Sequence, residues 1–233
     1  MTKLATHQSV RVHIESGEKV YKPGLLTQTI CNIMSVHKGD VAIDVGCGTG
    51  YIGIAASLLG ANKVYCIDPC PDALKCTLRN AGLNNVSNVS VMEGSELEPL
   101  KGKGADLIIT LPPQMPFSTD FNPERYGGID GTDVIIKIIR EASIILETGT
   151  GRFYLVHSSL ANTKRVRDEL SLNGFTWKII ETVEKELIKE DIDLLTDGLF
   201  EYIFDLYKKG IVELSERDGR FFYPVWFYLA NRV

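Results

Sequence analysis

The chain has 233 residues, of which 44% are apolar and 24% are charged, and its formal net charge is −5. This composition is ordinary for a globular protein and excludes a disordered or fibrous chain, and the length suits a single α/β domain over residues 1–233. No run approaches the ~18 consecutive apolar residues of a membrane-spanning helix, so we expect no membrane partner. The polar first eight residues lack the apolar stretch of a secretion signal, which predicts a cytoplasmic protein.

The acidic net charge disfavours a nucleic-acid partner without excluding one. The densest basic group, Lys164 to Arg167, is followed by Asp168 and Glu169, as on the solvated face of a helix. The cysteines are odd in number and lack the paired spacing of a zinc site, which predicts reduced thiols and no metal. They are Cys31, Cys47, Cys66, Cys70 and Cys76.

Short apolar runs alternate with amphipathic segments from residue 41 onward. Buried strands are predicted at Val41–Val45, Lys63–Asp68, Val89–Glu93, Asp106–Leu111 and Arg152–His157. Helices are predicted at Ile52–Leu59, Asp72–Ala81, Asp133–Leu146 and Thr163–Asn173. This alternation is typical of a doubly wound, mostly parallel sheet with helices on both faces.

The pattern changes at both ends of the chain. After Gly174, two long strand-like runs, Phe175–Leu187 and Phe221–Arg232, flank a helix predicted at Asp191–Lys209. We therefore expect seven strands with an antiparallel last strand, and a helical insert over residues 188–219. Near the start, Tyr21–Val36 predicts a helix within an N-terminal helical segment, residues 1–38, that would lie across the mouth of the sheet.

The strongest motif is a glycine-rich turn between the first strand and the helix that follows it. Gly46, Gly48 and Gly50 stand in this turn. Without Cβ atoms the backbone can approach a ligand closely, and the next helix presents free N–H groups. The second strand ends in Asp68, whose carboxylate can accept both hydroxyls of a ribose. The two signals together predict a nucleoside-containing cofactor.

A nicotinamide dinucleotide is the main alternative, because Gly48-x-Gly50-x-x-Gly53 satisfies the dinucleotide pattern. That pattern alone is weak. Asp44 stands two residues before the first glycine, where it would repel a pyrophosphate. The same carboxylate would attract a cationic group such as a methionine sulfonium.

Asp44-Val45-Gly46-Cys47-Gly48-Thr49-Gly50 followed by Asp68 resembles the cofactor signature of class I S-adenosylmethionine-dependent methyltransferases. The resemblance implies their Rossmann-like fold and S-adenosyl-L-methionine as cofactor, with Asp44 near its amino and sulfonium end. Asp68 would hold the ribose, Cys70 would lie near the adenine, and Ser95 would replace an acid that reads the adenine amino group. The cofactor-binding residues so implied are Tyr21, Thr27, Asp44, Gly46, Cys47, Gly48, Gly50, Asp68, Pro69, Cys70, Gly94, Ser95 and Thr110.

The fourth strand runs into Leu111-Pro112-Pro113-Gln114, which resembles the Asn-Pro-Pro-Tyr element of methyltransferases that modify planar nitrogens. Tyr126–Asp133 and Tyr21-Lys22-Pro23 are similar to segments of the release-factor glutamine N5-methyltransferase branch. However, Leu111 stands in place of the asparagine that bonds the target amide, and Gln114 in place of the stacking aromatic. The Pro-Pro scaffold is thus present without its two specificity groups.

Methyl transfer from a sulfonium needs alignment more than acid–base help. We expect Leu111, Pro112 and Pro113 to line the reacting centre, with His157, at a strand's carboxyl end, as the candidate base. A buried, bonded structural role is the other interpretation of His157. The loop acids that could bind a cationic substrate, if they are not solvated, are Asp120, Glu124 and Asp130.

Three functional hypotheses follow from these motifs. The first is a methyltransferase that modifies a nitrogen or oxygen of a small molecule or of an amino-acid side chain. The second is a methyltransferase for protein glutamine or for amino groups of RNA or DNA, which Leu111 and the acidic charge disfavour. The third is a non-catalytic cofactor-binding partner subunit, and the sequence also leaves a homodimer open.

Overall fold

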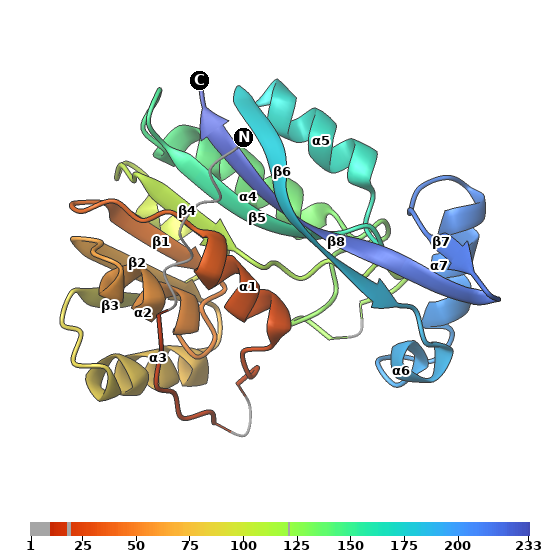
Figure 1. Cartoon of the computed structure of the whole chain (residues 1–233), viewed down its shortest axis with the longest axis horizontal. Coiled ribbons are helices and arrows are strands. Elements are labelled where there is room, and N and C mark those ends of the chain that lie inside the picture. The colour runs from red at the N-terminus through yellow and green to blue at the C-terminus, as the bar shows by residue number, and fades with distance from the viewer. Residues whose placement is uncertain (1–9, 18–19, 121) are drawn as a thin grey trace. The chain divides into compact units, whose positions relative to one another are not determined.

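The computed structural model describes residues 10–17, 20–120 and 122–233, and within it the chain forms two compact units, Met1–Thr110 and Leu111–Val233 (Figure 1). Helices and strands alternate through most of both units. Along this described part of the chain, no helix combines the length and apolarity that crossing a membrane requires.

The first unit is built on four parallel strands in the order β3-β2-β1-β4. They are β1 (Val41–Val45), β2 (Lys63–Asp68), β3 (Val89–Glu93) and β4 (Leu107–Thr110). Its helices are α1 (Leu25–Ile33), α2 (Tyr51–Leu58) and α3 (Pro71–Leu83), with a 3-10 turn at Glu98–Leu100. Val45 pairs with both Ile67 and Thr110, so β1, β2 and β4 end side by side. In an open parallel sheet this carboxyl edge is where ligands bind.

Residues 42–45 of β1 are all buried, as expected for a central parallel strand covered on both faces. α2 packs on β1 and β2, and α3 packs on β2 and β3. The apolar side chains of these strands are nearly inaccessible; Ala42, Val64, Leu107 and Ile108 are 0% exposed. A rigid core therefore supports the loops at the carboxyl edge.

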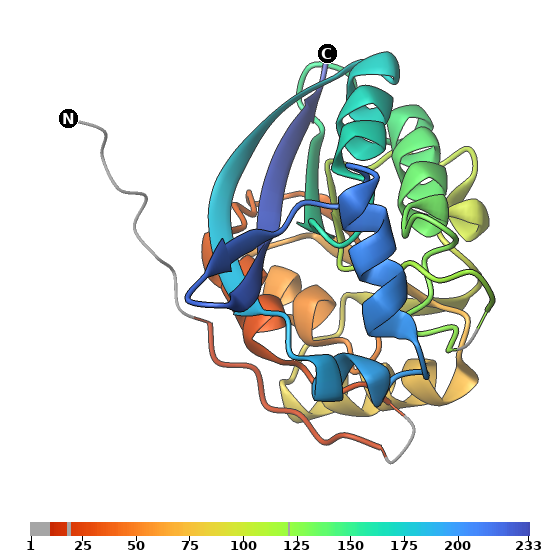
Figure 2. The ribbon, with the colours of Figure 1, turned by 90° about the vertical axis from the view of Figure 1, so that its right-hand side faces the viewer.

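The second unit contains antiparallel strands in the order β5-β8-β6, with the short β7 paired to β8. The strands are β5 (Arg152–Ser158), β6 (Phe175–Glu186), β7 (Ser215–Arg217) and β8 (Arg220–Arg232). The helices are α4 (Asp133–Ile145), α5 (Thr163–Leu172), α6 (Lys189–Asp193) and α7 (Leu199–Lys208). α4 and α5 lie side by side, and the long β6–β8 ribbon ends near α7 and β7 (Figures 1 and 2).

The predicted fold class, an α/β fold with mostly parallel strands and an antiparallel last strand, is confirmed. Two details of the insert were wrong. Asp191–Lys209 is not one helix, because Gly198 adopts a left-handed φ of 77° before α7 and Asp193 Oδ1 accepts from the Phe200 N–H. The insert also adds β7, an eighth strand in the described part of the chain.

The N-terminal prediction was also too helical. α1 begins only at Leu25, after the extended Gly24, and residues 10–17 and 20–24 form no helix. The predicted residues 1–9, 18 and 19 lie outside the described part of the chain. Pro23 explains the late start, because it disfavours helical geometry in the residue before it.

Candidate functional site

The glycine turn lies at the carboxyl end of β1, as predicted. Gly46, Gly48 and Gly50 have φ values of 75°, 53° and 77°, a region that side chains with a Cβ rarely adopt. A Cβ on Gly50 would lie 2.7 Å from Thr77 Cγ2 of α3, whereas no atom lies within 4 Å of a Cβ built on Gly46. The turn is therefore closed toward α3 and open at Gly46.

Asp68 is oriented by the backbone around it. Its Oδ2 accepts from the Gly48 N–H and its Oδ1 from the Cys70 N–H, both at 2.9 Å. Each carboxylate oxygen keeps further acceptor capacity, and the residue is only half-buried. The carboxylate is thus held in place while remaining able to accept a pair of hydroxyls.

Asp44 is buried and incompletely partnered. It is 1% exposed, and its Oδ2 accepts from the Gly53 N–H at 2.9 Å. Its Oδ1 is buried and has no hydrogen-bond partner in the described part of the chain. Burial raises the pKa of this carboxyl to about 7, although the Gly53 N–H lowers it and Asp68 adds repulsion. A cationic or donating group beside Oδ1 would remove this cost.

Two residues of α3 that the sequence analysis missed brace the turn. Thr77 Oγ1 donates to the Gly48 carbonyl at 3.1 Å, and the Cys47 thiol lies 3.4 Å from the same hydroxyl. Asn80 Nδ2 donates to the Thr49 carbonyl at 2.9 Å. Thr77 and Asn80 are each about 30 residues from the turn residue that they contact, so no local sequence pattern indicates these bonds.

The other predicted cofactor residues lie around this turn in different ways. The Tyr21 carbonyl is 3.9 Å from where a Cβ on Gly48 would stand, and the Gly94 N–H donates to the Asp68 carbonyl at 3.3 Å. Thr110 Oγ1 donates to the Val45 carbonyl, which ties β4 to the end of β1.

Four predicted residues make less specific contributions. Pro69 and Cys70 follow Asp68, Thr27 lies half-buried in α1, and Ser95 is exposed. Their roles toward a cofactor stay predictions. All five cysteines are unpaired in the structure, and only Cys70 is not buried.

In the second unit, the Gln114 side chain is bonded to backbone groups at the end of β5 and in its own loop. Its Oε1 accepts from the Ser158 N–H at 2.6 Å, and its Nε2 donates to the carbonyls of Val156 (3.2 Å) and Pro112 (3.3 Å). The amide therefore fastens the Pro-Pro loop to the end of β5. Leu111 and Pro113 are half-buried and Pro112 is buried.

The loop before α4 interlocks with this Pro-Pro loop. The Gly127 N–H donates to the Met115 carbonyl at 2.9 Å, and the Met115 N–H donates to the Arg125 carbonyl at 2.8 Å. A Cβ on Gly131 would lie 2.5 Å from the Gln114 carbonyl, so only glycine permits this approach. The two loops therefore form one backbone unit.

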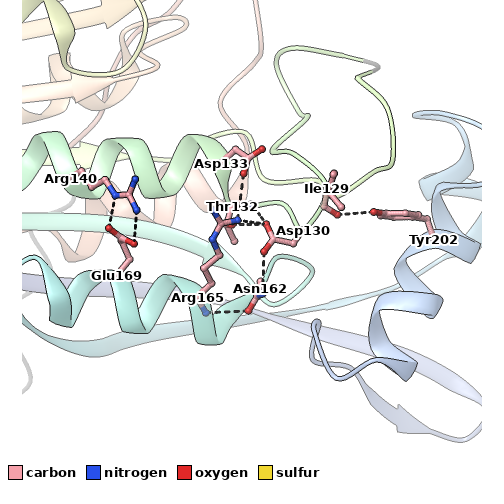
Figure 3. A network of polar contacts seen from close by, with 9 residues as sticks. All are labelled: Ile129, Asp130, Thr132, Asp133, Arg140, Asn162, Arg165, Glu169 and Tyr202. Carbon is pink, nitrogen blue, oxygen red and sulfur yellow. Dashed lines mark hydrogen bonds and ion pairs between the residues drawn. The ribbon is translucent and has the colours of Figure 1, made fainter.

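Asp130 is hydrogen-bonded within that loop and to α5. Its Oδ1 accepts from Thr132 and from Arg165 Nη1 (3.0 Å), and its Oδ2 accepts from Asn162 Nδ2 (3.1 Å). Figure 3 shows these bonds joining the loop to α5, with Tyr202 of α7 donating to the Ile129 carbonyl on the other side. Of the three predicted loop acids, Asp130 has its acceptor capacity used within the chain.

His157 is completely buried at the end of β5. Its Nε2 lies 3.3 Å from Thr163 Oγ1, its Nδ1 has no hydrogen-bond partner in the described part of the chain, and its ring stacks on Trp226. Burial, with the positive charge of Arg167, lowers the pKa of His157 to about 3. A base role stays a prediction, and this environment favours a structural one.

Comparisons with known proteins agree with this geometry. The model of the ribosomal protein L11 methyltransferase (PrmA) family matches residues 7–110. A Methanocaldococcus jannaschii protein named as a protein N5-glutamine methyltransferase is 36% identical over 154 residues, which cover 64% of this chain and 76% of that protein. The chain belongs to the class I S-adenosylmethionine-dependent methyltransferases.

Two further comparisons show how much of the chain resembles known proteins. The ribosomal protein L11 methyltransferase of Clostridium botulinum is 32% identical over 104 residues, which cover 45% of this chain but only 28% of that enzyme. The crystal structure of a methyltransferase from Pyrococcus furiosus has a TM-score of 0.61 at 16% identity and covers 95% of this chain. The latter likeness concerns the fold alone.

The family implies the use of S-adenosylmethionine, and the residues present fit it. The open turn, the oriented Asp68 carboxylate and the unpartnered Asp44 Oδ1 provide space, acceptors and negative charge. These are the features that an adenosyl sulfonium requires of its site.

The raised pKa of Asp44 predicts a pH-dependent affinity for S-adenosylmethionine. Below pH 7 the free methyltransferase carries a proton on Asp44 that a cationic ligand must displace, whereas above pH 7 it does not. We expect Kd to rise about tenfold for each pH unit below 7 and to be flat above it. Titration calorimetry in buffers of different ionisation enthalpy measures both Kd and the released proton. Asp44→Asn should bind more weakly with a flat profile; a retained slope would contradict the assignment.

The lowered pKa of His157 predicts a loss of stability in acid. The folded protein keeps this ring neutral down to about pH 3, while the unfolded chain takes up the proton near 6.5. The contribution is therefore fully present above pH 6.5 and falls by about 1.4 kcal/mol per pH unit as the pH drops toward 3. Urea unfolding of His157→Gln across this window should show a slope shallower by one proton. An unchanged slope would argue against the buried neutral ring.

The bonds of Asp130 predict a selective effect among the loop acids. Asp130→Asn should lower the free energy of unfolding by roughly 2 kcal/mol, because it weakens a partly buried network with several donors. Glu124→Gln, an exposed change in the same loop, should alter it by less than about 0.5 kcal/mol. Equal effects in chemical denaturation would show that Asp130 is not a structural node.

Proposed function

We propose that this methyltransferase binds S-adenosylmethionine at the turn after β1 and transfers its methyl group to a nitrogen or oxygen of a small molecule or an amino-acid side chain. The observation that carries the proposal is the pair of acids at the carboxyl edge. Asp68 is oriented with acceptor capacity to spare, and Asp44 is buried with one oxygen unpartnered. One suits a ribose and the other a cation.

The roles of the remaining residues follow from their place around the turn. The turn around the cofactor would be formed by Gly46, Cys47, Gly48 and Gly50, and it is braced by Thr77 and Asn80. The adenine of the cofactor would be surrounded by Pro69, Cys70, Gly94 and Ser95. The amino-acid end of the cofactor would be bordered by Tyr21, Thr27 and Thr110.

Little acid–base chemistry is required of this chain. The bound cofactor supplies a methyl group on a positively charged sulfur, which leaves as a neutral thioether. The protein's contribution is then to align the acceptor, exclude water and hold the sulfonium in place. The Pro-Pro loop, fastened by Gln114, and the loop before α4, fastened by Asp130, have the rigidity that suits that task.

The side chains of the Pro-Pro loop favour an acceptor other than a planar amide. Leu111 offers no hydrogen bond from its side chain, and the Gln114 amide is used by Ser158, Val156 and Pro112. The names of relatives refer to protein substrates, which favours an amino-acid side chain over a free metabolite.

A second candidate is a protein glutamine, supported by the name of the M. jannaschii relative at 36% identity. Leu111 and Gln114 oppose it, since neither side chain can recognise a carboxamide in this arrangement. A non-catalytic partner subunit, RNA or DNA amino groups, a homodimer and a cytoplasmic location stay predictions from the sequence.

Ligand binding tests the cofactor assignment directly. S-adenosylmethionine should raise the melting temperature and NAD should not, because a ligand that binds only the folded state stabilises it. Asp68→Ala should weaken binding by roughly tenfold or more, since it removes charge-assisted bonds to the ribose. Equal shifts with both ligands, or an unaffected Asp68→Ala protein, would refute the assignment.

Labelled S-adenosylmethionine tests the acceptor class. After incubation with cell extract and S-adenosylmethionine below its Kd, we expect label in protein or small-molecule fractions, and roughly tenfold less with Asp68→Ala. Label confined to RNA would overturn the proposed acceptor. Cofactor binding without transfer to any fraction would favour the partner-subunit hypothesis.

A further inference from the structure

An extended N-terminal segment, residues 10–17, lies along α3 and is held there by two asparagine side chains. We call it the strap. The His13 N–H donates to Asn84 Oδ1 at 2.9 Å, and Asn84 Nδ2 donates back to the His13 carbonyl. The Glu15 N–H donates to Asn80 Oδ1 at 2.8 Å, and Asn80 Nδ2 donates back to the Glu15 carbonyl at 3.0 Å. Figure 2 shows this segment running beside α3.

The spacing of the two asparagines matches the repeat of an extended chain. Alternate residues of a strand present their N–H and C=O groups toward the same edge about 6.7 Å apart. Side chains four residues apart on a helix share one face and are separated by a rise of about 6 Å. A carboxamide offers the donor and acceptor of a peptide unit, so Asn80 and Asn84 act like two positions of a neighbouring strand.

Asn80 also belongs to the cofactor turn. Its amide group donates to the Glu15 carbonyl with one hydrogen and to the Thr49 carbonyl with the other. The side chain is 0% exposed, and both of its polar atoms are bonded. One buried carboxamide therefore connects the strap to the loop that receives the cofactor.

The residues that follow the strap in sequence, Val20 and Tyr21, lie beside α3 and the glycine turn. Val20 is 8% exposed and packs on Ala73 and Cys76 of α3, beside Cys70. The next residue, Tyr21, places its carbonyl 3.9 Å from where a Cβ on Gly48 would stand. The Val20 N–H donates to the Gly17 carbonyl at 3.3 Å, which joins this part of the chain to the end of the strap.

We propose that Asn80 and Asn84 are positioning residues for S-adenosylmethionine, which act by clamping the strap and so pre-organising the glycine turn and the chain over it. The inference rests on the proposed cofactor but not on the identity of the methyl acceptor. Because coupling between two sites is reciprocal, cofactor binding must also tighten the strap.

Asn84 is the side chain to change, because it contacts the strap and the α3 carbonyl of Asn80 but not the turn. For Asn84→Ala we expect the Kd for S-adenosylmethionine, measured by calorimetry, to rise roughly fivefold, as for the loss of one or two neutral hydrogen bonds. In wild type, saturating S-adenosylmethionine should slow hydrogen exchange of the His13 and Glu15 amides. In Asn84→Ala the His13 amide should exchange freely.

His13→Pro removes the N–H that donates to Asn84 Oδ1, whereas the carbonyl at this position can still accept from Asn84 Nδ2. It leaves α3 unchanged, so it keeps the test valid if Asn84→Ala perturbs the helix. Its Kd should rise in the same direction, by roughly threefold, as for the loss of one of the two bonds. Arg79→Ala is the matched control, because it removes only the exposed 3.8 Å ion pair with Glu15 and should leave Kd unchanged.

A Kd within twofold of wild type in both clamp variants, with the His13 amide of Asn84→Ala exchanging freely, would overturn the inference alone. An increase of the same size for Arg79→Ala would overturn it too, since any strap contact would then suffice. If wild type shows no heat with S-adenosylmethionine, both the proposed function and this inference fail.

Discussion

The first unit depends on a buried carboxylate whose hydrogen bonding is incomplete. Asp44 ends β1 with one oxygen bonded to the Gly53 N–H and the other bonded to no atom in the described part of the chain. A buried carboxylate oxygen without a partner lowers the stability of the fold, and a protein retains such a group where a ligand supplies the missing hydrogen bond or charge. The surrounding structure tolerates the cost because β1 is central, rigid and flanked by β2 and β4 in fixed register. The site's charge thus comes from the core rather than from the surface.

The Pro-Pro loop has a rigid backbone but lacks the two side chains that, in the Asn-Pro-Pro-Tyr element it resembles, recognise the substrate. The Pro-Pro pair persists, but Gln114 uses its amide to fasten the loop to β5, and the loop before α4 is interlocked with it through Gly131. Asp130 and Tyr202 then secure that loop from α5 and α7. Rigidity is what alignment of a small methyl group requires, whereas specificity must come from other side chains.

Local pattern predicted what is local. The seven predicted strands, the glycine turn and Asp68 follow from apolar runs and from glycine at positions of positive φ, and they lie where expected, whereas the short β7 was missed. The break at Gly198 was missed because the apolar stripe continues across it. Asn80 and Asn84 could not be identified from the sequence. Their partners, Glu15 and His13, are 65 and 71 residues away, and asparagine on a helix is ordinarily assigned to the solvated face.

The boundary of the family match carries a physical meaning. The L11 methyltransferase model ends at residue 110, which is also where the first compact unit ends. Every residue that holds the turn, including Thr77 and the asparagine clamp, lies before that point, whereas Leu111, Gln114 and the α6–α7 insert lie after it. In the proposed function the first unit would bind the cofactor, which the family shares, and the second unit would select the acceptor.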